Sequence, residues 1–403
     1  MNVLVVNAGS SSLKYQLFDT NTMKVNAKGL CERIGMDGSR IEHKQADGTK
    51  TSKEIPMPNH AVATKVLVDT LTDPVIGCLK SMDEIEAVGH RIVHGGAYFF
   101  ESVVVTPEVI SKLEKCKDLA PVHTVPHLMG IAGITEVMPK VPQVLVFDTA
   151  FHQTMPKKAF FYPIPYEMYE KYDIRRYGAH GTSHRYVSGE MIKILGGKAE
   201  GTKIITCHLG NGSSISAVKD GKVIDTSMGF TPLAGVEMGT RCGDIDPAIV
   251  PFIMEKTGMT PAEMNNFMNK KCGFLGVSGV SSDGRDIEQG IADGNERCKL
   301  AMDILTYQIK KYIGAYAAAM NGVDAIVFTA GLGENSASVR AGALEGLDYL
   351  GVELDKEINA TSRGKVTKLS TDKSKVQVWL IPTNEELVIA SDTERLAKPI
   401  LGK

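Results

Sequence analysis

The chain has 403 residues, 43% of them hydrophobic and 23% charged, so it is long enough to bury the cores of two or three domains. Its 45 Lys and Arg against 47 Asp and Glu give a net charge of −2, which argues against nucleic acid or an anionic membrane surface as a partner. The sequence has no heptad repeat, no basic leader and no apolar run of about 18 residues, so we expect a soluble cytoplasmic protein without a membrane segment.

Short apolar strands alternate with longer helical patterns along the chain, which is the order of elements in an α/β protein. The predicted strands lie at residues 3–6, 13–18, 87–93, 143–147, 203–207, 213–218, 223–226, 325–329 and 376–381. Asp220-Gly221 is typical of a hairpin turn. Capping boxes at 260–263 and 383–386 predict helix starts, Pro247 predicts the first position of another helix, and residues 295–320 predict a long helix.

The seven cysteines are widely scattered, without a C-x-x-C pair. An odd number with this spacing argues against both a disulfide framework and a zinc site. We therefore predict reduced thiols that pack as small hydrophobic side chains in the cores, at Cys31, Cys78, Cys116, Cys207, Cys242, Cys272 and Cys298.

The first half of the chain is weakly repeated in the second. A strand, a Gly/Ser turn and a second strand occupy residues 3–18, and residues 204–218 follow the same plan. A third strand, at 325–329, also runs into glycines. Two similar halves predict a two-lobed α/β protein with a ligand cleft between the lobes. We expect one lobe of residues 1–148 plus 385–403 and another of residues 149–384.

Three glycine turns directly follow apolar strands and are candidate phosphate-binding elements. Asn7-Ala-Gly-Ser-Ser-Ser-Leu-Lys14 offers backbone N–H groups, hydroxyls and a lysine, although a plain Ser/Gly hairpin has the same composition. His208-Leu-Gly-Asn-Gly212 and Gly331-Leu-Gly-Glu-Asn335 are the others, and neither completes a P-loop or a dinucleotide fingerprint. Together the three turns favour one nucleotide held by several segments.

Other polar residues are candidates for anion binding or proton transfer. Arg91 and Arg241 lie beside glycines, where bidentate anion binding is the alternative to an ordinary solvated role. Asp148 ends a predicted strand at the edge where α/β proteins bind ligands, or else caps a turn. His180, in His180-Gly-Thr-Ser-His184, lacks the glutamate of a zinc motif, which favours hydrogen bonding in a cleft or a structural role over metal ligation.

Eight segments together resemble those of the acetate kinase family in order and spacing. They lie at residues 7–14, 89–96, 147–152, 177–184, 207–212, 238–247, 328–335 and 382–386. The resemblance covers essentially the whole chain. It implies the duplicated, two-lobed fold of the actin-like ATPase and sugar kinase superfamily (ribonuclease H-like), a homodimer, and reversible Mg²⁺-dependent transfer of a phosphoryl group directly from ATP to acetate, giving acetyl phosphate and ADP.

The resemblance also implies roles for individual residues around the reacting groups. Asn7 and Glu385 would organise Mg²⁺, or Mn²⁺ in its place, although the helix macrodipole alone also accounts for an acid at Glu385. His180 and Arg241 would stabilise the phosphoryl group in transfer, and Asp148 would be the catalytic acid or base. The residues around acetate would be Arg91 for the carboxylate, His123, and Val93 and Pro232 for the methyl group.

The nucleotide would be held mainly by the second lobe, which would also carry the dimerisation surface, and Lys14 of the first lobe would face the phosphates. The phosphate-binding residues implied by the resemblance are His208, Leu209, Gly210, Asn211 and Gly212. Those implied for adenosine are Asp283, Gly284, Arg285, Gly331, Leu332, Gly333, Glu334 and Asn335.

The chemistry requires positive charge more than a base. A carboxylic acid titrates at about pH 4.3, so acetate is already an anionic nucleophile at neutral pH. Positioning and charge stabilisation then remain as the main tasks, and we expect Asp148 to orient magnesium-bound waters or a neighbouring donor. Two alternatives stay open: a propionate or butyrate kinase of the same family, and an actin-like ATPase without a small-acid substrate.

Overall fold

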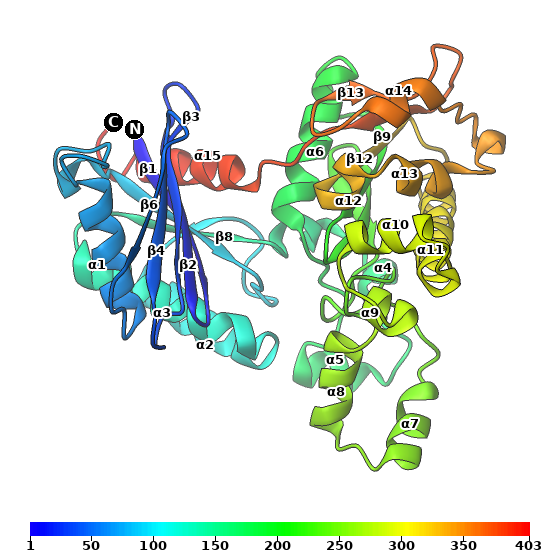
Figure 1. The fold of residues 1–403 in the computed structure, drawn as a ribbon, viewed down its shortest axis with the longest axis horizontal. Coiled ribbons are helices and arrows are strands. Elements are labelled where there is room, and N and C mark those ends of the chain that lie inside the picture. Colours follow the sequence, from blue (N-terminus) through cyan, green and yellow to red (C-terminus); the bar gives the residue numbers. More distant parts are fainter. The chain divides into compact units, whose positions relative to one another are not determined.

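A computed structural model describes residues 1–403 and divides the chain into two compact units (Figure 1). Unit 1 comprises Met1–Ala150 and Asn384–Lys403, and unit 2 comprises Phe151–Thr383. Each unit is built on one mixed β-sheet with helices packed against it. No helix has the length and hydrophobicity needed to span a bilayer.

The sheet of unit 1 has eight strands. They are Asn2–Gly9 (β1), Ser12–Asp19 (β2), Lys24–Glu32 (β3), Arg40–Gln45 (β4), Lys50–Glu54 (β5), Ala87–Ile92 (β6), Val103–Val104 (β7) and Gln143–Phe147 (β8). Their order across the sheet is β5-β4-β3-β2-β1-β6-β8-β7.

The sheet of unit 2 has six strands. They are Lys203–Leu209 (β9), Ser213–Lys219 (β10), Lys222–Thr226 (β11), Ala325–Thr329 (β12), Thr367–Lys368 (β13) and Gln377–Leu380 (β14). Their order is β11-β10-β9-β12-β14-β13.

The two sheets repeat the same pattern of five strands. In unit 1, β3, β2 and β1 are successively antiparallel, and β1, β6 and β8 are successively parallel. In unit 2, β11, β10 and β9 are antiparallel, and β9, β12 and β14 are parallel. The weak repeat in the sequence thus corresponds to a structural duplication, and the predicted duplicated α/β fold is confirmed.

The longer helices flank these sheets, and shorter ones fill the connections. Their bounds are His60–Leu71 (α1), Pro107–Lys115 (α2), Pro121–Val137 (α3), Lys157–Phe160 (α4), Tyr166–Tyr172 (α5), Gly181–Ile194 (α6), Ile249–Thr257 (α7), Pro261–Lys270 (α8), Gly273–Ser278 (α9), Gly284–Ala292 (α10), Glu296–Met320 (α11), Ala330–Asn335 (α12), Ala337–Leu344 (α13), Lys356–Thr361 (α14) and Glu385–Ala397 (α15). Four 3₁₀ turns lie at 82–84, 116–118, 150–154 and 348–350.

The sheet of unit 1 separates two cores, because successive side chains of a strand point to opposite faces. Leu4 on β1 packs in the core formed with α1 and α3, whereas Val3 packs in the core formed with α15. Gly89 on β6 lets α15 approach closely: a Cβ at this position would lie 2.3 Å from Thr393 Oγ1. The chain thereby returns α15 to the sheet built by its first residues.

Unit 2 is layered in the same way. Ile205 and Cys207 of β9 pack in a large core with the long helix α11. Ile204 packs on the other face with Val187 and Met191 of α6. The same α6-facing side of β9 and β10 also carries hydroxyl and imidazole groups, which belong to the candidate site.

Most predicted elements are present, with local differences. The long helix and the capping box at Thr260 are confirmed. The last helix is instead capped by Asn384, whose side chain accepts from the Leu387 N–H, and α7 begins at Ile249, two residues after Pro247. Strands β3, β4 and β5 were not predicted. They carry mostly charged and polar side chains, so they lack an apolar run.

All seven cysteines are free thiols, as predicted. The expectation that all of them are core residues is wrong for three. Cys78 is exposed, and Cys242 and Cys272 are half-buried, because these three lie in loops or at a helix start rather than on a core strand.

Candidate functional site

The unit 1 part of the predicted site lies where three parallel strands end. Asn7 on β1 and Arg91 on β6 each come two residues after a position that faces α15, so they share that face. Asp148 directly follows β8, and Glu385 is the first residue of α15. The fold therefore gathers these four residues from distant parts of the chain at one sheet edge.

Arg91 is paired with carboxylates on two sides. Its Nη2 donates to Asp148 Oδ2 at 2.6 Å, and its Nε lies 3.7 Å from Glu385 Oε2. Asp148 is almost fully buried, and its backbone N–H donates to the Ile92 carbonyl at 2.8 Å. The Asp148 carboxylate is the main reason why the pKa of Arg91 is raised above its ordinary value, and Glu385 acts in the same direction. The guanidinium is therefore fixed in place and permanently charged.

A pocket of about 740 Å³ in unit 1 joins these groups to the open face of the sheet. Asn7, Lys14, Arg91 and Glu385 all line it. Lys14 is paired directly opposite Asn7 in the β1–β2 ladder. The structure thus brings together the residues that the sequence predicts for Mg²⁺, phosphate and carboxylate on this unit.

The donor set fits Mg²⁺ only together with a substrate. No cluster of three or more His, Cys, Asp or Glu side chains that could hold a metal is present. Asn7 and Glu385 supply one amide and one carboxylate in the same pocket. This is what Mg²⁺ usually takes from a protein when substrate phosphates and water complete its octahedron.

The unit 2 part of the site is centred on Gly212, at the start of β10. A Cβ built on Gly212 would lie 3.2 Å from Arg241 Nη1 and 3.5 Å from His180 Nε2. A guanidinium and an imidazole nitrogen from distant segments thus converge on the position that a side chain at Gly212 would occupy. Burial lowers the pKa of Arg241 from its ordinary value, but a guanidinium remains charged at neutral pH.

His180 is held in an uncommon backbone conformation. It precedes α6 with φ of 62°, in the left-handed region that non-glycine residues seldom adopt. Its ring stacks on His208 with centroids 4.0 Å apart, and His208 Nδ1 is 2.7 Å from Ser183 Oγ. Strain of this kind persists only where surrounding contacts impose it, often at functional sites.

The segment that carries Arg241 is tied to the glycine turn. Gly239 N–H donates to the Asn211 carbonyl at 3.1 Å, and a Cβ on Gly239 would collide with Asn211 Oδ1. Arg241 Nη1 donates to the Pro232 carbonyl at 3.2 Å. Asn211 and Gly239 therefore fix the distance between the arginine and the turn.

The segments predicted to bind adenosine also meet. A Cβ on Gly284 would lie 2.4 Å from Leu332 Cδ2, so Gly284 and the 331–335 segment are in direct contact. Asp283 caps α10 and pairs with Arg285, whose hydrogen bonds lower the pKa of Asp283 to about 2. Thr329, just before the 331–335 segment, is paired with His208 in the β12–β9 ladder. The predicted phosphate and adenosine segments are thus contiguous.

The other predicted residues are distributed between the units. Glu334 accepts the Ala330 N–H at 2.8 Å, and Asn335 Nδ2 donates to the Gly331 carbonyl at 2.9 Å, so both stabilise α12. Val93 N–H donates to His127 Nε2 at 3.1 Å, and His127 stacks near His123. Val93 and Pro232 belong to different units, and the apolar pocket for a methyl group stays a prediction.

Sequence reasoning missed Thr206 and Ser214 as part of the site, and treated His184 only as half of a motif. All three are fully buried and hydrogen-bonded around His180. The sequence does contain a signal for them. On the face that packs against α6, β9 and β10 carry hydroxyl groups and a histidine beside aliphatic residues. Alternation alone, however, is also typical of a half-exposed sheet.

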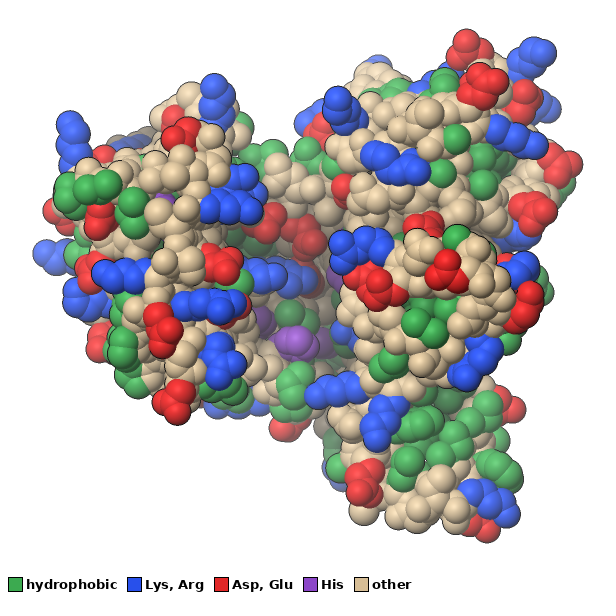
Figure 2. All heavy atoms as spheres, viewed as in Figure 1, with side chains coloured by type: hydrophobic (Ala, Val, Ile, Leu, Met, Phe, Trp, Pro, Cys, Tyr) green, Lys and Arg blue, Asp and Glu red, His purple; other side chains and the backbone are tan.

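The charge distribution agrees with a small anionic ligand rather than a polyanion. On the face shown in Figure 2, Lys and Arg are interspersed with Asp and Glu, in keeping with the net charge of −2. Arg91, which pairs with Asp148, and Arg241, near Gly212, instead lie in the two parts of the candidate site.

Comparison with known proteins decides the family. The model of the acetokinase family matches residues 2–391. The chain belongs to the acetokinase family. It is 57% identical over 393 residues to a protein named acetate kinase from Desulfitobacterium hafniense, covering 98% of each chain.

Solved structures of this family have the same fold. The crystal structure of Porphyromonas gingivalis acetate kinase matches with a TM-score of 0.95 and 49% identity, over 98% of this chain and 99% of that one. A propionate kinase from Francisella tularensis matches with a TM-score of 0.91 and 41% identity, over 98% and 99% of the two chains.

Proposed function

We propose that the protein is an acetate kinase, which transfers the γ-phosphoryl group of ATP to acetate to give acetyl phosphate and ADP. The observation that carries the proposal is the convergence of His180 Nε2 and Arg241 Nη1 on the open space at Gly212, in a chain of the acetokinase family. Donors placed around a phosphoryl group stabilise the charge that its oxygens carry in transfer.

Unit 1 supplies the acceptor site in this proposal. Arg91 uses one Nη2 hydrogen for Asp148 and lines the pocket, so other N–H groups of its guanidinium remain for a carboxylate. Acetate is an anion at neutral pH, so no group needs to remove its proton. Asp148 therefore acts by fixing Arg91 rather than as a general base.

Asn7 and Glu385 would hold Mg²⁺ together with phosphate oxygens and water. When bound, the ion neutralises phosphate charge and brings the β- and γ-phosphates into position. Lys14, on the strand next to Asn7, adds a positive charge that faces the phosphates.

Unit 2 supplies the nucleotide site. The turn at 208–212 would bind phosphate, and the contact between Gly284 and Leu332 would form part of the adenosine site. His180 and Arg241 would then contact the γ-phosphoryl group. Both units are needed for the reaction in this scheme, because the acceptor group Arg91 and the donors at Gly212 belong to different units.

A propionate kinase is the second candidate. Ala179, next to His180, lies in a small buried cluster with Met228 and Met238. The cluster is closely packed, so a longer acyl chain would enter it only if the methionine side chains change their conformation, as methionine does readily. One of the matched solved structures is named a propionate kinase.

The deciding experiment offers Mg-ATP with formate, acetate, propionate or butyrate and traps acyl phosphate with hydroxylamine. We expect the largest kcat/KM with acetate, and Arg241→Ala serves as the matched inactive control. A maximum with propionate or butyrate would assign the longer-chain activity. ATP hydrolysis without hydroxamate from any acid would refute the kinase proposal.

We also propose a homodimer and a cytoplasmic location, where ATP is available. Support for the dimer comes from exposed apolar side chains on unit 2, with Phe252 of α7 59% exposed and Tyr307 of α11 61% exposed. Light scattering should give twice the 43.5-kDa mass of the chain. A monomer mass at micromolar concentration would contradict the dimer.

A further inference from the structure

A buried polar layer lies between α6 and the sheet of unit 2, directly behind His180. Ser214 Oγ is 2.7 Å from His180 Nδ1 and 2.7 Å from His184 Nε2. His184 Nδ1 is in turn 2.7 Å from Thr206 Oγ1. Thr206, His184 and Ser214 are all 0% exposed. Three short hydrogen bonds thus connect a strand threonine to the histidine that faces Gly212.

The number of protons in this chain restricts its arrangement. Burial, with the neighbouring rings of His152 and His208, lowers the pKa of His184 well below its ordinary value, so the His184 ring is neutral and has one N–H. A hydroxyl also has a single proton to donate. If every short contact is a hydrogen bond, the single N–H of His184 makes the bonds to Thr206 and Ser214 run in one direction, either toward His180 or away from it. When they run toward His180, Ser214 can give its own proton either to His180 Nδ1 or to the Ala179 carbonyl.

The contacts of Thr206 favour the direction toward His180. In that direction Thr206 donates to His184, His184 Nε2–H donates to Ser214, and Ser214 donates to His180 Nδ1. In the reverse direction Thr206 must use its proton elsewhere, and its other acceptor, the Ser216 carbonyl, is 3.5 Å away. A contact of this length is barely a hydrogen bond. For Ser214 the competing acceptor, the Ala179 carbonyl, is at 3.2 Å, longer than the contact with His180.

We propose that Thr206, His184 and Ser214 are positioning residues, whose one-way hydrogen bonds make His180 Nδ1 an acceptor and so place the proton of the ring on Nε2, the nitrogen that faces Gly212. His180 then presents an N–H, and not a lone pair, to a phosphoryl oxygen. The benefit for transfer rests on the proposed function, since it requires an anion at Gly212. The tautomer of His180 itself does not depend on the proposed function.

The test records the ¹⁵N spectrum of histidine-labelled full-length protein without substrates, with the His180 signals assigned by their loss in His180→Gln. Wild type should show the Nε2–H tautomer at His180. Thr206→Val removes the first donor at constant shape and should shift the ring toward the Nδ1–H tautomer. Thr206→Ser retains the hydroxyl and should restore the wild-type pattern.

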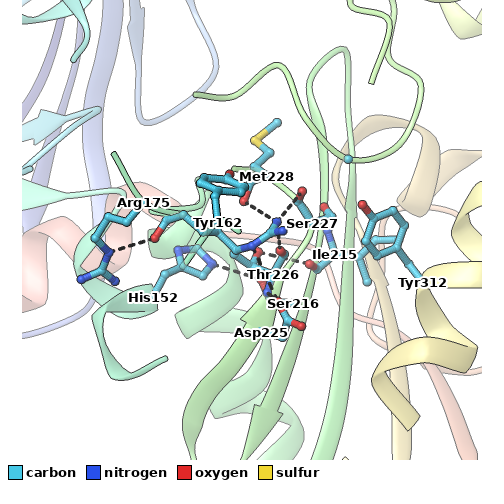
Figure 3. A network of polar contacts seen from close by, with 12 residues as sticks. His152, Tyr162, Arg175, Ile215, Ser216, Asp225, Thr226, Ser227, Met228 and Tyr312 are labelled. Atoms are coloured by element: carbon cyan, nitrogen blue, oxygen red, sulfur yellow. Dashed lines mark hydrogen bonds and ion pairs between the residues drawn. The ribbon is translucent and has the colours of Figure 1, made fainter. Parts of the chain in front are cut away.

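The matched control is Thr226→Val, on β11, which β10 separates from the strand of Thr206. Thr226 is equally buried, but its Oγ1 bonds Ser216 Oγ at 2.9 Å, which in turn bonds His152 Nε2 at 3.0 Å, and not a member of the Thr206–His184–Ser214 chain (Figure 3). It should leave the His180 tautomer unchanged. Thr206→Val should also lower kcat roughly ten- to a hundredfold, as is usual for residues that orient a functional histidine, with little change in the KM for acetate.

The outcomes separate the two proposals. An Nδ1–H tautomer in wild type, or an Nε2–H tautomer that persists in Thr206→Val, would overturn the one-way chain while leaving the kinase activity intact. A tautomer shift without loss of kcat would confirm the chain but overturn the role of the His180 N–H in transfer. A shift with loss of kcat, restored in Thr206→Ser, supports both.

Discussion

Arg91→Ala should affect acetate binding and stability together, because the same guanidinium serves the pocket and the buried Asp148. A hydrogen bond to a charged partner contributes about 1.5–3 kcal/mol. Its loss should raise the KM for acetate roughly ten- to a hundredfold. The kcat should change much less, because acetate loses the same contact in the ground state and in the transition state.

The loss of stability in Arg91→Ala depends on how well Asp148 is solvated once its partner is removed. Asp148 has a side-chain exposure of 2%, whereas that of Arg91 is 25%. Removing one partner of a fully buried pair costs about 3–5 kcal/mol, since the other charge stays buried without a partner. Water can reach the space left by Arg91, so we expect about 2–3 kcal/mol, equivalent to a decrease in Tm of roughly 4–12 °C for a unit of this size.

The assay is a double-mutant cycle with Arg91→Ala, Asp148→Asn and the double variant, followed by calorimetry and acetate kinetics. The stability losses should be non-additive by at least about 1 kcal/mol, because each single change already breaks the pair. The control is Arg40→Ala, on β4 of the same unit, whose ion pair with Glu32 is at the surface. That variant should lose less than about 1 kcal/mol. Additive losses together with an unchanged KM would refute the dual role of Arg91.

Three further predictions concern single residues. Arg241→Ala should lower kcat roughly a hundredfold or more with a small change in the KM for acetate, measured by steady-state kinetics, and a change confined to KM would contradict its role in transfer. Asp148→Asn should raise the KM for acetate, because it releases Arg91, and its loss of activity should not be rescued by high pH or by a small exogenous base; rescue would instead identify a general base. Glu237 is buried and neither carboxyl oxygen has a hydrogen-bond partner, and burial raises its pKa from 4.5 to about 8. Its contribution to stability is therefore complete below pH 4.5 and is lost as the pH rises toward 8, by up to about 1.4 kcal/mol per pH unit. Urea unfolding at pH 5 and pH 8 should show this loss in wild type but not in Glu237→Gln, and equal losses would show that another group titrates.

The parts of the fold that the sequence predicts are those where burial forces a simple pattern. Parallel strands covered on both faces are continuous apolar runs, so β8 and β12 were predicted at their observed bounds. The strands at 24–54 are largely exposed and rich in Lys and Glu, so the extension of the sheet beyond β2 has no hydrophobic signature. They are recognised only in the structure, where they extend the sheet beyond β2.

The residues of the candidate site also differ in how far the sequence predicts them. Asn7, Arg91 and Asp148 could be proposed from the sequence because they lie near or just beyond the ends of apolar strands, where α/β proteins bind ligands. Thr206 and Ser214 could not, because a hydroxyl inside a strand has no distinctive spacing. Their function depends on where α6 places His180 and His184, and that is a property of tertiary packing.

The glycine turn at 208–212 suits the proposed phosphate binding for a different physical reason than the one the sequence suggests. Backbone N–H groups freed by glycine were expected to bind phosphate, but the Gly210 N–H already donates to the Gly212 carbonyl at 3.1 Å. Gly212 is not among the residues with positive φ, so the backbone does not require glycine there. What glycine provides at this position is volume, since a side chain would occupy the space on which Arg241 and His180 converge. In the proposed function, the anion site is therefore formed by side chains around an absent one, and its donors come from segments that no local motif joins.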